Sequence, residues 1–242
     1  MNRTKQIAVL SGALVALLLL AIGGVYLFGR DSSAAPGAAV RSTEPLDLGP
    51  VIATVDGAPI YLGEAKARID GLTTMHGDLT AALGADWHEV VLGSLVSDQV
   101  QRAEAKARGI VVTDTDIQSS VADITDMLGE GQTLDDWLAA QEMSYSELVR
   151  RIELQLIGSR VYLAVSKDVT VSGQAIRDYY RENPTEFEGT DGHISPLLEV
   201  RKSIRDSLMK TEQEQAYSAW LEKAKSDADV VIVMKDWWKD LG

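Results

Sequence analysis

Hydrophobic positions first form one unbroken stretch near the start of the chain. Residues 7–29 contain no charged side chain, and at about 1.5 Å per residue a helix of this length spans the roughly 30 Å hydrocarbon layer of a bilayer. Arg3 and Lys5 precede the stretch, so the positive-inside rule places the N-terminus in the cytoplasm. We predict a cytoplasmic stub at 1–6, a single-pass signal-anchor in the cytoplasmic membrane at 7–29, and an extracytoplasmic body.

The segment that follows the membrane stretch has no apolar periodicity. Residues 30–50 are rich in Ser, Ala, Gly and Pro, which is typical of a flexible linker. Cleavage after the small residues at 32–35 would release the body from the membrane, and this alternative stays open.

Alternating hydrophobic positions return at residues 51–62, with the sequence VIATVDGAPIYL. Asp56 and Gly57 at their centre tolerate the positive φ angles of a tight turn, which predicts a β-hairpin. Pro59 has no N–H to donate, so its strand should be short or lie at an edge. The β-branched run at 229–234 is the other predicted strand. Because a lone hairpin is marginally stable, we predict that this run pairs with it and buries Val231 and Val233.

Between these strands, hydrophobic residues recur at the three- and four-residue spacing of helices. Each predicted helix start has a hydroxyl side chain that can cap backbone N–H groups, often with an acid three residues later. These capping residues are Thr113, Thr133, Ser144, Ser172 and Ser195. The predicted fold class is therefore mostly α: a multi-helix module closed by a small β-sheet from the N-terminal hairpin and the C-terminal strand, preceded by one transmembrane helix.

Composition excludes several classes of function. Asp and Glu number 36 against 23 Lys and Arg, for a net charge of −13, and so acidic a chain repels nucleic acid. Cysteine is absent, which excludes disulfides, thiol catalysis and thiolate metal sites. The three histidines are not at metal-ligand spacing, and no nucleotide-binding loop or nucleophile elbow occurs. We therefore expect no enzymatic activity, no cofactor, no metal and no nucleotide.

Several Met and aromatic residues lie outside the clearest helical stripes. Flexible Met and amphipathic aromatic side chains line surfaces that bind varied apolar partners, although the same side chains can also fill a core. The candidates for a binding surface are Met75, Trp87, Met127, Trp137, Met143 and Tyr145. A further pair, Trp237-Trp238, lies in the tail at 235–242. It can dock back on the body or contact lipid headgroups.

Three stretches of the body resemble the SurA/PrsA family of extracytoplasmic chaperones. Residues 51–69 resemble the family's opening hairpin and helix, and residues 95–121 resemble its second helix, Gly-Ile link and capped third helix. Residues 145–187 resemble its long helix and the tyrosine pair before Asn-Pro, and the closing segment at 197–233 is similar as well. The resemblance implies that residues 51–234 form a SurA N-terminal-like chaperone domain, which binds unfolded or partly folded secreted polypeptides without ATP.

The chain departs from this family at one place. A parvulin-type prolyl isomerase domain commonly follows the tyrosine helix, but here only residues 188–194 lie between Phe187 and Ser195. So short a segment cannot fold as a domain, and we expect a membrane-anchored holdase or folding factor without isomerase activity. A dedicated partner-binding subunit of a membrane or envelope complex is the main alternative, and an isomerase-related protein is a more distant one.

Overall fold

The computed structural model describes residues 46–189 and 192–241, which form two compact units. The first unit consists of residues 46–161 and 224–241, and the second of residues 162–223. No helix within the described residues is long and apolar enough to cross a bilayer. The predicted membrane span at 7–29 lies outside them.

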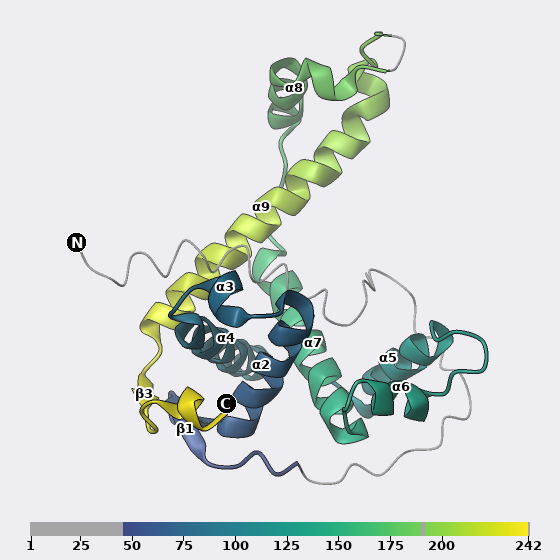
Figure 1. Ribbon diagram of the computed structural model, residues 1–242. Coiled ribbons are helices and arrows are strands. Elements are labelled where there is room, and N and C mark those ends of the chain that lie inside the picture. Colours follow the sequence, from purple (N-terminus) through teal and green to yellow (C-terminus); the bar gives the residue numbers. More distant parts are fainter. Residues whose placement is uncertain (1–45, 190–191, 242) are drawn as a thin grey trace. The chain divides into compact units, whose positions relative to one another are not determined.

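A three-stranded antiparallel sheet with the order β2-β1-β3 joins the hairpin to the C-terminal part of the chain (Figure 1). β1 (Val51–Val55) and β2 (Ala58–Tyr61) flank Asp56 and Gly57, whose φ angles of 50° and 79° form the tight turn. β3 (Val230–Ile232) pairs with β1. The predicted pairing of the C-terminal strand with the hairpin is therefore confirmed, and β2 is short and lies at an edge, as predicted.

The third strand does not have the buried environment that the sequence predicted. Val231 and Val233 are both exposed, so the prediction that they are buried is wrong. The reason is that α4 (Trp87–Ala107) packs against β1 and β2, whereas β3 lies at the other edge of the sheet. The core of the sheet lies there instead, and Ile52, Ala53 and Ile60 are fully buried.

Two further helices follow the hairpin directly. α2 (Leu62–His76) packs against both α3 (Leu79–Leu83) and α4. The Arg68 guanidinium on α2 donates to the Asp98 carboxylate on α4 at 2.6 Å. The buried Gln99 on α4 donates its side-chain N–H to the carbonyl oxygen of the second strand's proline at 3.0 Å. These polar contacts hold α2 and α4 in place beside the sheet.

The remaining helices of the first unit begin at the predicted capping residues. Thr113 accepts a hydrogen bond at the start of α5 (Asp114–Asp126), and Thr133 does so at the start of α6 (Leu134–Ala140). In both boxes the acid three residues later accepts the return hydrogen bond. Ser144 accepts from the Glu147 N–H at the start of α7 (Tyr145–Ser166). Helices α5, α6 and α7 share one apolar cluster, made of Val121, Ile124, Leu134, Leu138, Leu148 and Ile152.

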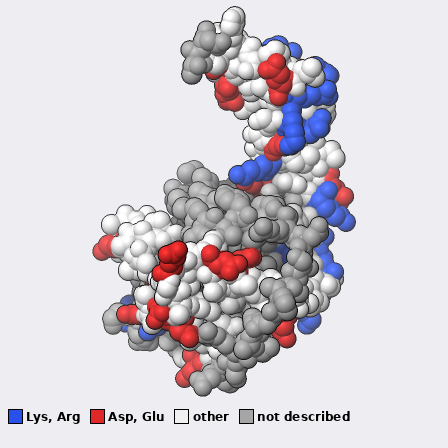
Figure 2. Space-filling model, turned by 90° about the vertical axis from the view of Figure 1, so that its right-hand side faces the viewer, with Lys and Arg blue, Asp and Glu red and all other residues white. Residues whose placement is uncertain are grey.

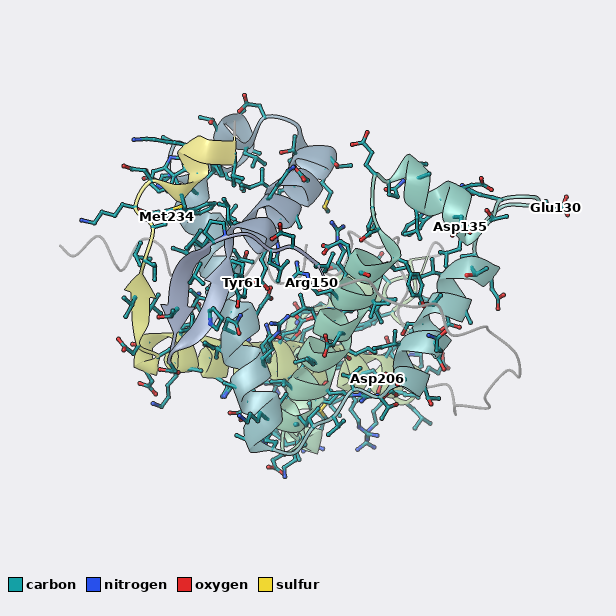
Figure 3. All side chains as sticks on the ribbon, turned by 90° about the horizontal axis from the view of Figure 1, so that it is seen from below. Tyr61, Glu130, Asp135, Arg150, Asp206 and Met234 are labelled. Atoms are coloured by element: carbon teal, nitrogen blue, oxygen red, sulfur yellow. The ribbon has the colours of Figure 1, made fainter. Side chains whose placement is uncertain are left out.

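Two ion pairs connect α7 to neighbouring elements of the first unit. Arg150 donates to the buried Glu64 carboxylate of α2 at 2.9 Å, close to Tyr61 (Figure 3). Arg160 donates to the Asp116 carboxylate of α5 at 2.5 Å. The Arg160 hydrogen bond, with those from Thr113, lowers the pKa of Asp116 to about 2. This carboxylate therefore stays charged, and the link to α7 stays intact, throughout the neutral and mildly acidic range.

The second unit is built by the end of α7, α8 (Gly173–Glu182), the 3₁₀ helix η1 (Pro184–Phe187) and most of α9 (Leu197–Asp227). Ser172 caps α8 as predicted, accepting from the Ala175 N–H. Ser195, which the sequence predicts as the cap of α9, lies two residues before the helix. The N–H groups of Glu199 and Val200 donate instead to the Pro196 carbonyl oxygen. The buried core of this unit includes Ile176, Ile204 and Tyr217.

The connection between η1 and α9 is short and turns back on itself. Glu188 and Ile194 form an antiparallel bridge, and the Ser195 N–H donates to the Phe187 carbonyl oxygen at 2.8 Å. Tyr180 on α8 donates its hydroxyl to the Ser195 carbonyl oxygen, also at 2.8 Å. The chain therefore passes from the tyrosine helix into α9 without an inserted domain.

Candidate functional site

The C-terminal tail packs back onto the first unit. Trp237, the first residue of the 3₁₀ helix η2 (Trp237–Leu241), is only 2% exposed. The Trp238 indole stacks on the His88 imidazole of α4, with ring centroids 3.7 Å apart and an interplanar angle of 20°. The chain can turn into η2 because Asp236 adopts a φ of 59°. Of the two interpretations of the tryptophan pair, the structure therefore shows docking on the body.

A surface groove of about 270 Å³ lies between the end of α2, the start of α3, the start of α4 and η2. Asp78 is the charged residue of its lining, and its carboxylate is occupied in capping α3 through the Ala81 N–H at 2.8 Å. The volume is below the range usual for pockets that enclose a whole small molecule. The groove therefore has room for individual side chains of a longer ligand. Its apolar lining consists of Ile69, Leu79, Trp87, Trp238 and Leu241.

Two of the six predicted binding residues lie at or near this groove. Trp87 lines it, and its ring meets the His88 ring edge-to-face with centroids 6.0 Å apart. Met75 lies in the last turn of α2, between the lining residues Thr73 and Gly77, and its side chain is exposed. The groove is thus bordered by the kinds of side chain that the sequence analysis selected.

The other four predicted residues lie around the apolar cluster of α5, α6 and α7. Trp137, Met143 and Tyr145 are partly buried against that cluster, and the Tyr145 hydroxyl accepts a hydrogen bond from Gln118 at 3.4 Å. Met127 follows α5 directly and is exposed. The structure therefore places three of these side chains in core packing, and a role of all four in binding stays a prediction.

Most residues of the groove lining carry no signal in the sequence that marks them as binding residues. Ile69 and Leu79 belong to two helices that pack against each other. In the sequence, an apolar residue on such a helix cannot be distinguished from a core residue. Trp238 and Leu241 come from the tail, where the tryptophan pair was the one available signal. That signal marks an unusual tail, but it does not indicate which helix the tail contacts.

A second cavity, of about 390 Å³, lies within the second unit. Tyr179, Phe187 and Ile204 contribute its aromatic and apolar walls. The Tyr179 hydroxyl donates to the Glu186 carboxylate at 2.8 Å, and this bond raises the pKa of the tyrosine. The phenol therefore stays protonated and is unsuited to act as a base. Among the described residues, no group of three or more His, Asp or Glu side chains could hold a metal ion.

Charge is unevenly distributed between the two units. Residues 46–161 and 224–241 contain 11 basic and 23 acidic side chains, a net charge of −12. In the second unit, basic side chains gather over α8 and α9 (Figure 2). Arg177 and Arg201 converge there, since both approach within 4 Å of the position that a Gly173 Cβ would take. The acidic character of the chain therefore belongs mainly to the unit that carries the groove.

Comparisons with known proteins agree with this architecture. The sequence profile of the SurA-like N-terminal domain matches residues 1–162. A foldase protein PrsA from Clostridium perfringens is 25% identical over 198 residues, which cover 77% of this chain and 54% of the relative. A chaperone SurA from Saccharophagus degradans is 25% identical over 202 residues, covering 81% of this chain and 47% of the relative. The chain thus spans about half the length of these curated relatives.

The fold also matches a solved structure. One chain from a study of two structurally related SurA-like chaperones of Campylobacter jejuni superposes with a TM-score of 0.54. The match covers 76% of this chain and 99% of that chain, at 12% sequence identity. At such low identity the superposition establishes a shared fold and nothing more.

Proposed function

The chain belongs to the family of SurA-like N-terminal domains, and we propose that it is a holdase or folding factor for unfolded or partly folded secreted polypeptides. In this proposal residues 51–234 form the chaperone domain, and residues 7–29 anchor it in the cytoplasmic membrane with the body on the extracytoplasmic side. Relatives named as a foldase and a chaperone support the assignment.

The groove between α2, α3, α4 and η2 is the observation that carries the proposal. Unfolded chains expose apolar side chains that a folded protein buries, and the two tryptophans of the groove offer a matching surface. Burying one large apolar side chain contributes about 1.5–3 kcal/mol. A dissociation constant of 1 mM already corresponds to about 4.1 kcal/mol, so a single insertion binds weakly. A weakly held segment can leave by itself, which is why release needs no ATP.

The charge of the first unit supports a preference among clients. A net charge of −12 on that unit attracts basic segments and repels acidic ones over a distance of about 10 Å at moderate salt. The same charge keeps a chaperone soluble when an apolar client covers its groove. We therefore infer that segments with apolar side chains next to Lys or Arg are preferred.

The anchor predicted at 7–29 and the linker predicted at 30–50 would place the action of the chain near the membrane. A flexible linker of about 20 residues has a root-mean-square span of roughly 25 Å. If the anchor holds residue 30 at the surface, the groove samples the layer next to the bilayer, where secreted chains emerge. The connection between Phe187 and Ser195 is too short to contain an isomerase domain. In this proposal the chain therefore holds its clients and does not isomerise their prolines.

The proposal is tested with the full chain reconstituted in nanodiscs. It is expected to suppress light scattering by several unrelated unfolded clients at near-stoichiometric amounts, equally with and without ATP. Isomerisation of a proline peptide is expected to stay at the uncatalysed rate. Failure to protect any client, combined with saturable binding of one partner, would instead favour a dedicated partner-binding subunit. Isomerisation above background would contradict a holding-only function.

A further inference from the structure

The second unit presents a basic face along α8 and the first half of α9 (Figure 2). Successive residues of an α-helix are turned by about 100°, so residues three, four and seven positions apart share one side. On α9, four exposed residues lie in this way within about one third of the circumference: Leu198, Arg201, Lys202 and Arg205. Three of the four are basic, and we call them and Leu198 the basic face.

The two arginines of this face are not neutralised within the chain. Lys202 forms an ion pair with Asp206, one turn further along α9, at 2.5 Å. Arg201 and Arg205 have no ion-pair partner in the part of the chain that the structure describes. Their positive charge is therefore available to a partner outside the chain.

A third arginine, from α8, lies beside this face. The Arg177 guanidinium donates to the neutral side-chain oxygen of Gln174 at 2.7 Å. Its Nη1 atom and the Nη2 atom of Arg201 lie 3.6 and 3.8 Å from the position that a Gly173 Cβ would take. Two like charges held this close repel each other, and the positive potential that they create favours an anionic partner.

An exposed leucine lies among these cations. Leu198 is 84% exposed, the largest fraction for any large hydrophobic side chain of the described residues. Ile194, just before α9, is 48% exposed. A basic helix face that also carries exposed apolar side chains is typical of proteins that bind a membrane surface, because the cations contact lipid phosphates while the apolar side chains enter the headgroup layer.

We propose that the basic face binds the surface of an anionic phospholipid bilayer. The guanidinium groups of Arg177, Arg201 and Arg205 donate to lipid phosphate oxygens, and Leu198 enters the layer between the headgroups. The anchor predicted at 7–29 keeps the face close to the bilayer, so that weak contacts suffice to hold it there. This contact does not involve the groove.

The combination of side chains favours a bilayer over the acidic first unit of a second copy. A surface rich in carboxylates neutralises arginines, but it gives no role to an exposed leucine among them. At a bilayer the arginines meet phosphates and the leucine meets apolar chains, so both features contribute to binding. The first unit, with a net charge of −12, is repelled by the same anionic surface. The basic face is therefore the part of the body that such a surface selects.

A fluorophore that responds to its surroundings tests the contact, because the full chain contains no cysteine and can be labelled at one position. The full chain with Leu198→Cys, labelled with nitrobenzoxadiazole, is placed in nanodiscs of phosphatidylcholine alone or mixed equally with phosphatidylglycerol. In the anionic discs the emission is expected to shift to shorter wavelength and to rise several-fold, and in the neutral discs it is expected to stay unchanged. The same label at Val111→Cys, a position of the first unit that is 67% exposed, is expected to respond to neither.

Retention of the chain in the discs during gel filtration reports the anchor separately. For a chain that is not retained, vesicles of the same two compositions replace the discs, and the emission shift remains the measurement. Failure of the predicted anchor is thereby distinguished from failure of the surface contact. Client protection in the light-scattering assay reports the groove independently of both.

Removal of charge in the labelled Leu198→Cys background provides a second measurement. Arg201→Gln combined with Arg205→Gln is expected to abolish most of the emission shift in anionic discs. The matched control, Lys66→Gln combined with Lys106→Gln, removes the same charge from exposed positions of the first unit and is expected to keep the shift.

Three results would overturn the proposal: no shift in anionic discs, a shift of equal size in neutral discs, or an equal loss in the two double variants. A shift that grows with the number of chains in each neutral disc would also overturn it, and would assign the basic face to a second copy.

Discussion

Replacing Arg150 by alanine is expected to lower the free energy of unfolding of the first unit by about 3 kcal/mol. Its guanidinium donates to the Oε1 atom of Glu64 at 2.9 Å, and the Glu64 residue is only 6% exposed. The other carboxylate oxygen accepts the Tyr61 N–H at 2.9 Å. Without Arg150, a buried carboxylate at the start of α2 loses its charge partner, and α7 loses its direct link to α2.

The neighbouring arginine is a matched control for this substitution. Arg151 donates to the Glu147 carboxylate at 2.9 Å, as Arg150 also does at 3.2 Å, but no contact joins Arg151 to Glu64. The Arg151 side chain is 31% exposed against 14% for Arg150, so Arg151→Ala should cost less than about 1 kcal/mol. Urea unfolding followed by tryptophan fluorescence measures both, since four of the five tryptophans belong to the first unit. Equal losses would show that the pair with Glu64 is not responsible.

The second large effect is expected from Trp237→Ala, at about 3–5 kcal/mol. The Trp237 side chain is almost completely buried, and its ring meets that of Trp238 edge-to-face with centroids 5.8 Å apart. The segment leading to it is held by the Met234 N–H, which donates to the Ile52 carbonyl oxygen at 3.0 Å. Removing the indole leaves a cavity and releases the tail from the first unit.

Trp238→Ala separates loss of packing from loss of the tail's surface contacts. Trp238 is partly exposed and stacks on His88. Its replacement should lower the free energy of unfolding by about 0.5–1.5 kcal/mol for the lost ring contact, with a further loss from reduced burial. The total should be smaller than for Trp237→Ala. Thermal unfolding of the full-length variants, followed by circular dichroism, gives the comparison. An unchanged midpoint for Trp237→Ala would mean that the tail does not stabilise the unit.

The sequence predicts those features of this fold that depend on neighbouring residues. The capping boxes at Thr113 and Thr133 are confirmed because a hydroxyl and an acid three residues apart satisfy each other's backbone groups locally. The Asp56-Gly57 turn is confirmed because both residues adopt the positive φ angles that a tight hairpin turn requires. The prediction that Ser195 caps α9 is wrong, because the helix begins two residues later, at Leu197. The chain enters that helix directly after the bridge between Glu188 and Ile194.

Features that depend on distant segments are not predicted. Whether Val231 is buried depends on what covers the outer strand, and the β-branched run itself does not contain that information. The groove joins Trp87 to Trp238, which are far apart in the sequence, and no periodic pattern connects them. Core packing of Trp137 and Met143 likewise depends on how α6 and α7 meet.

The most direct measurement of client holding compares two full-length variants in the light-scattering assay. One carries polar substitutions at the groove, Met75→Gln, Trp87→Ser and Trp238→Ser, and the other carries Val111→Ser and Leu198→Ser at exposed positions that do not line the groove. Helicity by circular dichroism checks that both remain folded. The groove variant is expected to lose most of its protection of an unfolded client, while the control variant retains it. Equal protection by two folded variants would contradict the assignment of client holding to the groove.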